Sequence, residues 1–304
     1  MRYGAHLPLI DFDGQSWGNG RLAGYTDAAR ELGFEFVSAN DHLIFARPWL
    51  DGIVALASVI ERSGNMRLAT TVALPVIRGP SALAKAAAAL DIISGGRLVL
   101  GVGPGSSEHD YRCARVSFDE RWPRLDESIR VLRAQLKADE PFDGHYYTTD
   151  TLEPRPTQPD GPPIWIGSWG SDAGIRRVAR LGDGWLASAY NRTPAGIAEA
   201  REKLRRALSR VGRASDGFPC SLASMWMYVT DDKRAREAHL STLARMLNRP
   251  ADVIDQQVLV GPAEKCAETL RAYADAGIDR VFVWPLGDAE EQLGRFMGTV
   301  APLV

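Results

Sequence analysis

The sequence has few cysteines and no long hydrophobic run. Three cysteines, Cys113, Cys220 and Cys266, are spread over 304 residues, and no two are spaced as a C-x-x-C motif. This argues against a disulfide scaffold or a structural zinc site and favours three structural thiols in a reducing cytoplasm. The first residues lack the apolar region of a signal peptide, and no stretch of 18 apolar residues occurs. We therefore expect no membrane span.

Net charge is also nearly absent. The chain carries 36 Lys and Arg against 38 Asp and Glu, a formal net charge of −2. No global field therefore favours nucleic acid or an anionic membrane, and the aromatic residues are not interleaved with basic clusters. The sequence contains neither an H-E-x-x-H metal motif nor a G-x-S-x-G nucleophile motif. We expect no nucleic-acid partner, no membrane partner and no metal site.

Short apolar runs that alternate with amphipathic segments are abundant. Eight runs are rich in Val, Ile, Leu, Phe or Trp, as expected of strands buried on both faces. They cover residues 2–7, 34–39, 67–74, 97–102, 163–167, 184–188, 221–229 and 280–284. Apolar residues recur at helical spacing between them, for example in residues 22–32. Gly33, Gly182 and Gly277 follow such segments, where the end of a helix favours a left-handed residue.

The repeated order of helix, glycine and strand predicts parallel βα units. Eight units favour a single (β/α)8 barrel domain over residues 1–304, and a doubly wound open sheet is the alternative. Two segments interrupt the repeat. Residues 141–163 are rich in proline, and we predict a short hairpin inserted before the fifth strand. Residues 231–257 are polar and helical and lengthen the seventh unit.

In a parallel barrel, the loops after the carboxyl ends of the strands carry the active site. His6, His42 and His109, three of the five histidines, fall in these loops. His42 follows Asp41 after the second strand, and imidazole titrates near neutral pH, so we expect His42 to exchange a proton. His6 is equally compatible with a buried core position, and His109 with an exposed loop.

Two glycine-containing loops follow the fourth and fifth strands. Residues 101–111 lack the third glycine of the dinucleotide-binding fingerprint, but their glycines would let the backbone approach a flat ligand. A plain tight turn is the alternative. Residues 167–171 precede a helix whose N-terminal amides would suit a phosphate, and an ordinary N-cap at Ser171 or Asp172 is the alternative.

Four segments together resemble the luciferase-like monooxygenase family, and within it the branch that uses the deazaflavin coenzyme F420. They are AARELGFEFVSANDHLIF, RLATTVALPVIRGPSALAKAAAALDIISGGRLVLGVGPG, PPIWIGSWGSDAGIRRVARLGDGW and VGPAEKCAETLRAYADAGIDRVFVWPLGD, in this order along nearly the whole chain. The resemblance implies a flavin or deazaflavin across the barrel mouth, a small-molecule substrate and a homodimer.

The resemblance also implies roles for particular residues. The Asp41-His42 pair matches the family's Asp-His pair, in which the His faces the cofactor ring or the substrate. Thr71-Val72 matches the position at which many members carry a non-proline cis peptide behind the ring. The candidate catalytic residues are His42, Asp41, Glu108 and His109. The candidate cofactor-binding residues are Asp41, His42, Thr71, Val72, Gly103, Gly105, Ser106, Ser107, Gly167, Ser168, Trp169 and Gly170.

One position departs from the sugar-phosphate dehydrogenase of this family. That enzyme has a catalytic Glu directly after the glycine loop, where this chain has Ser106, and Glu108 stands two residues further on. The departure argues against a sugar-phosphate substrate. Aromatic residues at Trp17, Phe45, Trp49, Tyr111, Tyr190 and Trp284 are expected to shape the substrate pocket.

The predicted reaction is hydride transfer between C5 of F420 and a small organic substrate, with His42 as proton donor or acceptor. The first alternative is an FMN-dependent monooxygenase fed by a separate reductase. The second is a non-catalytic flavin-binding protein.

Overall fold

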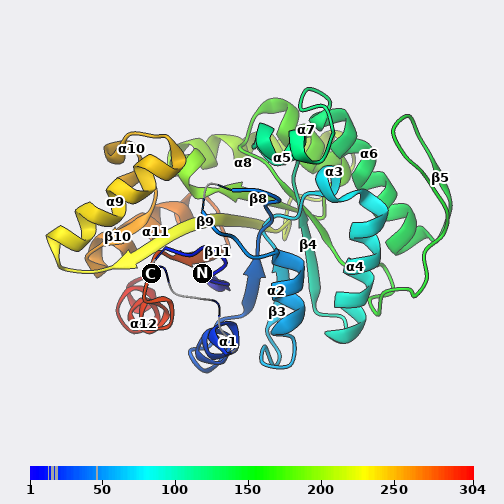
Figure 1. The fold of residues 1–304 in the computed structure, drawn as a ribbon. Coiled ribbons are helices and arrows are strands. Elements are labelled where there is room, and N and C mark those ends of the chain that lie inside the picture. The colour runs from blue at the N-terminus through cyan, green and yellow to red at the C-terminus, as the bar shows by residue number, and fades with distance from the viewer. Residues whose placement is uncertain (13, 15–16, 18–19, 46) are drawn as a thin grey trace.

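Eight parallel strands form the centre of the molecule (Figure 1). The computed structural model describes residues 1–12, 14, 17, 20–45 and 47–304. The barrel strands are β1 (Arg2–His6), β2 (Phe36–Ala39), β3 (Arg67–Thr70), β4 (Leu98–Val102), β7 (Ile164–Gly167), β8 (Gly184–Ser188), β9 (Cys220–Val229) and β11 (Arg280–Pro285). Each pairs with the next, and β8 pairs with β9 while β11 pairs with β1, so the sheet closes. The predicted barrel is confirmed, and the open sheet is excluded.

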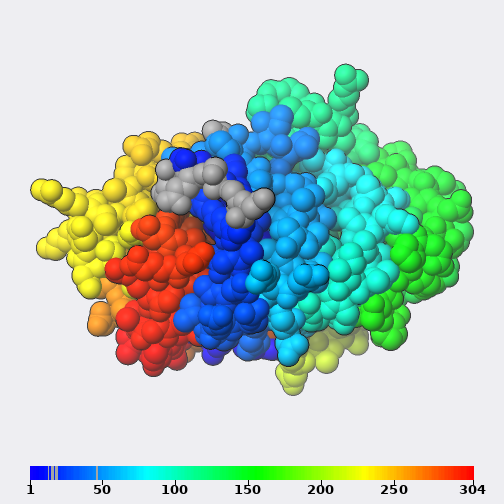
Figure 2. All heavy atoms as spheres, turned by 60° about the horizontal axis from the view of Figure 1, so that its bottom comes forward, coloured from blue at the N-terminus to red at the C-terminus, as the bar shows by residue number. Residues whose placement is uncertain are grey.

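Helices cover the outside of this barrel. They are α1 (Arg21–Glu31), α2 (Gly52–Ser58), α3 (Pro75–Arg78), α4 (Pro80–Ile93), α5 (Glu108–Cys113), α6 (Arg121–Arg133), α7 (Asp172–Leu181), α8 (Pro194–Arg210), α9 (Lys233–Leu247), α10 (Ala251–Asp255), α11 (Ala263–Asp275) and α12 (Ala289–Arg295). The longer helices bury an apolar stripe, as α7 does with Ile175, Val178 and Ala179. Figure 2 shows α12 (red) directly beside α1 (blue), which completes the ring of helices.

Both predicted interruptions are present. The antiparallel pair β5 (Phe142–Asp143) and β6 (Thr148–Thr149) forms a hairpin that projects from the side of the barrel (Figure 1). The buried Glu127 carboxylate accepts the backbone N–H groups of the turn, including that of Tyr146 at 2.6 Å. Helices α9 and α10 lengthen the seventh unit. The structure adds β10 (Leu259–Gly261), which pairs with β9. Its three residues are too few to give a periodic signal.

The interior of the barrel changes character along its axis. The middle is filled by apolar side chains: Phe36, Ala69, Val99, Trp165, Leu186, Ala223 and Phe282. Side chains alternate across a strand, so the next inward positions toward the carboxyl ends include His6, Ser38 and Trp284. A register shift between Val281 and Val283 marks a bulge in the β9–β11 pairing. The polar positions therefore collect at the end of the barrel where the predicted active-site loops lie.

Candidate active site

His42 and Asp110 form a hydrogen-bonded pair at the carboxyl end of the barrel. Nδ1 of His42 lies 2.9 Å from Oδ2 of Asp110, and the other carboxylate oxygen accepts the backbone N–H of Ile44 at 2.8 Å. The Asp110 side chain is 2% exposed and that of His42 is 19% exposed. A carboxylate accepts at this contact, so a proton resides on Nδ1 of His42. Nε2 is then the atom that can exchange a proton.

Two aromatic side chains flank the His42 ring. Its centroid lies 4.8 Å from that of Phe45 and 4.6 Å from that of Trp49. Among hydrogen bonds between described residues, none involves Nε2 of His42. The ring is thus held by Asp110 and by the two aromatic side chains while Nε2 stays open to a substrate.

The prediction from sequence selected the two residues before Asp110 and not Asp110 itself. Glu108 and His109, both predicted as catalytic, are exposed in the first turn of α5. Ser107 is the N-cap of α5, and its hydroxyl accepts the N–H of Asp110 at 3.1 Å. The spacing of Ser107 and Asp110 is that of a capping box, which would have marked Asp110 as ordered. Its carboxylate turns to His42 and Ile44, contacts that no local spacing reveals.

Replacing Asp110 by Asn is expected to lower kcat/KM. An Asn amide would donate to Nδ1 and move the His42 proton to Nε2, the wrong tautomer for accepting a proton there. We expect a loss of roughly 10²-fold, part of what general acid–base catalysis contributes.

Comparison of kcat with F420 affinity distinguishes this positioning role from a structural one, since kcat should fall in D110N while F420 affinity stays near that of the wild type. Glu108→Gln, on the exposed face of the same helix turn, is the matched control and should keep the wild-type kcat. A D110N variant with the wild-type kcat would contradict the role given to Asp110.

Asp41 is occupied by an ion pair. Its oxygens accept Nε and Nη2 of Arg78 at 2.5 and 2.7 Å, and Oδ2 also accepts the N–H of Leu74 at 3.3 Å. Arg78 bonds Asp51 as well, the N-cap of α2. These bonds tie the end of β2 to α2 and α3. The position of Asp41 thus supports a structural role, whereas the resemblance implied a catalytic one.

Val72 lies at the centre of the mouth. The Thr71-Val72 peptide is cis, as the family resemblance implied. A Cβ added at Gly103 would lie 2.9 Å from Cγ2 of Val72, and one added at Gly167 would lie 3.1 Å from its Cγ1. Glycine at both positions therefore makes room for Val72. Together they form a smooth apolar surface on which a flat ring can lie.

The rest of the glycine loop lies beside this surface. Gly105 has φ of +75°, a conformation that glycine adopts without strain, and Ser106 is exposed. Tyr111 is buried, and its hydroxyl donates to the carbonyl of Pro104 at 2.5 Å. The role expected for Tyr111 in shaping the substrate pocket is instead a role in holding the loop.

The loop before α7 keeps some of its amides free. The N–H of Ser168 donates to Leu186, and that of Gly170 donates to the Ser168 hydroxyl. Ser171 is the N-cap of α7 and accepts the N–H of Gly174. Hydrogen bonds within the described chain use neither the Trp169 nor the Ser171 amide as donor, and the Trp169 side chain is 51% exposed. The N-cap alternative is confirmed, and the free amides still suit an anion.

His6 is a buried core histidine. Nδ1 donates to the carbonyl of Leu7 at 2.8 Å, and the ring stacks on Trp284 at 3.6 Å between centroids. Burial lowers the pKa of His6 to about 3, against the opposing effect of the Leu7 carbonyl. His6 is therefore neutral at physiological pH and serves as part of the wall.

Several buried polar atoms at this end have no partner within the described chain. They are Ser38 Oγ, Thr71 Oγ1, Trp226 Nε1 and Trp284 Nε1. Buried donors and acceptors are almost always satisfied, so unpaired ones gathered at one end of a barrel indicate a polar ligand. A flavin or deazaflavin, which carries ring oxygens and N–H groups, fits them.

Three further findings concern metal sites, membrane-spanning helices and cysteines. Among the described residues, no group of three or more His, Cys, Asp or Glu side chains is placed to hold a metal ion. Within the same part of the chain, no helix is both long and apolar enough to cross a bilayer. All three cysteines are free, with Cys220 and Cys266 buried and Cys113 exposed.

Comparison with known protein families identifies the class of protein to which this barrel belongs. A sequence model of the luciferase-like monooxygenase family matches residues 18–280. The chain therefore belongs to this family, as its motifs indicated.

Relatives with assigned activities are similar over most of the chain. An F420-dependent hydroxymycolic acid dehydrogenase of Mycobacterium tuberculosis is 33% identical over 233 residues, which span 72% of this chain and 61% of the relative. An F420-dependent glucose-6-phosphate dehydrogenase of Nakamurella multipartita is 30% identical over 322 residues, which span 95% of this chain and 93% of the relative. These relatives support the F420-dependent branch of the family.

Solved structures share the fold. An F420-dependent secondary alcohol dehydrogenase in complex with an F420-acetone adduct superposes with a TM-score of 0.87 at 19% identity, over 100% of this chain and 98% of that one. The monooxygenase RslO1 from Streptomyces bottropensis gives 0.85 at 21% identity, over 99% of both chains.

Proposed function

We propose that the protein is an F420-dependent oxidoreductase that transfers a hydride between C5 of the deazaflavin and a small organic substrate. The His42–Asp110 pair carries this proposal, because it leaves Nε2 without a partner at the carboxyl end of the barrel, the end at which Val72 packs against Gly103 and Gly167. Relatives whose names specify F420-dependent dehydrogenases support the choice of cofactor.

The residues at the mouth of the barrel have different roles in the proposed reaction. Bound F420 supplies or accepts the hydride. Val72 and the two glycines would orient its ring, and the free amides of Trp169 and Ser171 would hold its phosphate. Nε2 of His42 takes the proton from a substrate hydroxyl, or returns it to a carbonyl oxygen, while Asp110 keeps the ring in the required tautomer. Trp226 and Trp284 exclude water from the substrate side.

A hydroxyl or carbonyl compound without a phosphate is the proposed substrate class. Ser106 stands at the position of the catalytic Glu in the sugar-phosphate dehydrogenase, and it is exposed. Asp41 and Asp51 already occupy Arg78, so this arginine offers no free charge to a phosphate. The homodimer, a separate reductase and the cytoplasmic location stay predictions.

Parallel titrations with F420 and FMN test the cofactor. We expect saturable quenching of F420 fluorescence, with FMN binding at least tenfold more weakly, and reduction of F420 by a panel of secondary alcohols. Oxygen uptake with reduced FMN and no turnover with F420 would instead establish the two-component monooxygenase. Tight binding without turnover of any alcohol or carbonyl compound would point to a flavin-binding protein.

A further inference from the structure

Three arginines occupy strand positions at the end of the barrel opposite the mouth. Arg2 begins β1, Arg67 begins β3 and Arg280 begins β11. Arg2 pairs in register with Arg280, and Arg67 with Phe36, whose ring lies inside the barrel. Neighbours in register share a face of the sheet, so all three arginines belong to the inward-facing set. Barrel interiors are ordinarily filled by branched apolar side chains, and three guanidinium groups in one layer are unusual.

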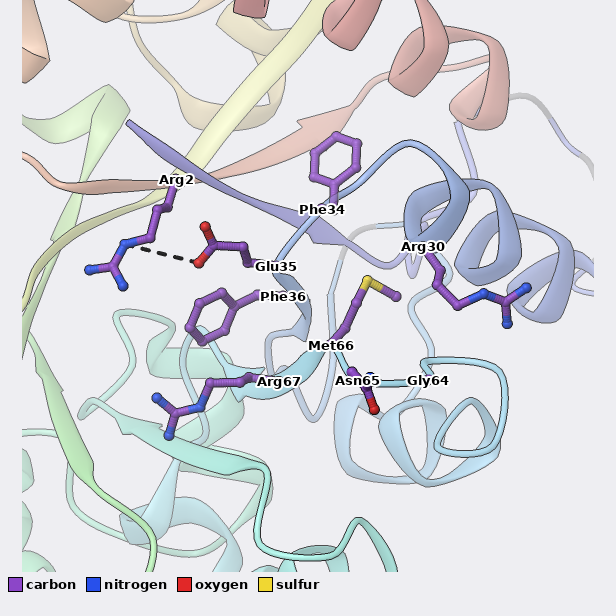
Figure 3. A pocket seen from close by; sticks show the side chains of 9 residues that line it. All are labelled: Arg2, Arg30, Phe34, Glu35, Phe36, Gly64, Asn65, Met66 and Arg67. Atoms are coloured by element: carbon purple, nitrogen blue, oxygen red, sulfur yellow. Dashed lines mark ion pairs between the residues drawn. The ribbon is translucent and has the colours of Figure 1, made fainter.

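A cavity of about 540 Å³ opens beside this layer (Figure 3). Arg2, Arg67, Phe36, Glu35 and Asn65 contribute to its lining. Figure 3 shows Arg2 and Arg67 extending on one side of the Phe36 ring, while Arg30 points away on the other side. The Phe36 ring is a shared floor, because the guanidinium carbon of Arg67 lies 5.7 Å from its centroid and that of Arg280 lies 4.9 Å away.

The positive charge of this layer is only partly compensated. Arg2 lies 4.0 Å from Glu35 and 3.4 Å from Asp279, and Arg280 lies 3.6 Å from Asp279. Within the described chain, Arg67 makes no ion pair. The negative charge of Asp91 raises the pKa of Arg67 without a direct contact, and both oxygens of Asp91 already accept hydrogen bonds from Gln158. Two carboxylates therefore compensate the charge of three guanidinium groups.

Arg280 is the buried member of this layer and does not line the cavity. It is 3% exposed, and Nη1 donates to the hydroxyl of Ser221 at 3.0 Å. Its guanidinium carbon lies 4.9 Å from the ring centroid of Phe36 and 5.0 Å from that of Trp165. Arg280 therefore adds positive charge beneath the Phe36 ring without contacting the cavity itself. Burial lowers the pKa of Arg67 and of Arg280, and the neighbouring arginines add to the effect.

We propose that this end of the barrel binds a small oxyanion, of the phosphate or carboxylate class, between Arg2 and Arg67 over the Phe36 ring. Arg67 is the principal ligand, because a planar guanidinium pairs with two oxygens at once and this one has no competing carboxylate. The site lies at the opposite end of the barrel from His42, so it does not depend on the proposed function.

Calorimetric titration of the full-length protein with inorganic phosphate tests the site, at constant ionic strength set with chloride. We expect saturable binding that raises Tm, and at least a tenfold loss of affinity in Arg67→Gln. Arg67→Lys keeps the positive charge but not the planar guanidinium, and it should lose less affinity for phosphate than Arg67→Gln. Arg62→Gln is the matched control, since Arg62 is exposed and pairs with Asp27 outside the cavity.

Succinate in place of phosphate distinguishes a carboxylate ligand from a phosphate. The far-ultraviolet circular dichroism spectrum should be unchanged in all three variants, which shows that they are folded. Absence of saturable binding of both anions, or equal affinities in R67Q and R62Q, would overturn the proposal.

Discussion

Replacing His42 by Asn is expected to lower kcat/KM by about 10²- to 10⁴-fold, the usual contribution of a general acid–base residue. Asn reproduces the donor at the position of Nδ1 and removes Nε2. The buried Asp110 carboxylate, 2% exposed, therefore keeps a partner, and the substrate loses its proton acceptor. We expect thermal stability to stay near that of the wild type, so that the loss can be assigned to chemistry.

Steady-state kinetics with F420 and a secondary alcohol measure this effect. His109→Asn is the control, because His109 is exposed on α5 and should keep full activity. F420 affinity is expected to change far less than kcat in H42N. If H42N turned over at the wild-type rate, His42 would not be the proton-exchanging group.

Replacing Arg78 by Met is expected to lower the free energy of unfolding by about 3 kcal/mol. Removal of one partner from a buried ion pair typically costs 3–5 kcal/mol, because the other charge stays buried and unpaired. The low end applies, since the Arg78 side chain is 27% exposed while that of Asp41 is 5% exposed. Asp41 would keep only the 3.3 Å bond from the Leu74 amide.

Urea denaturation of single and double variants separates the two roles suggested for Asp41. The double variant R78M/D41N should recover part of the lost stability, because the buried Asp41 charge is removed and Asp51, which also loses Arg78, has a side chain that is 42% exposed. Arg62→Met, which removes an exposed ion pair, should stay within about 0.5 kcal/mol of the wild type. If D41N kept its stability but no longer bound F420, Asp41 would contact the cofactor as the family resemblance implied.

Sequence periodicity was sufficient for the architecture because each βα unit buries its own apolar stripe. The eight runs of Val, Ile, Leu and Phe give the eight barrel strands, and the proline-rich segment gives the hairpin. Closure could not be derived in this way, since it depends on the pairing of β8 with β9 and of β11 with β1. The three-residue strand β10 was not predicted, because three residues are too few to show the two-residue alternation of a strand.

The sequence by itself determined the family, the eight βα units and the loop that carries His42, because these follow from short-range patterns. Only the tertiary structure showed which carboxylate bonds to which side chain. Asp41 follows a strand next to His42, yet it turns to Arg78, whereas Asp110 reaches His42 from 68 positions along the chain. The two glycines beside Val72, and the arginines at the opposite end, likewise acquire meaning only when the closed sheet brings distant strands into register.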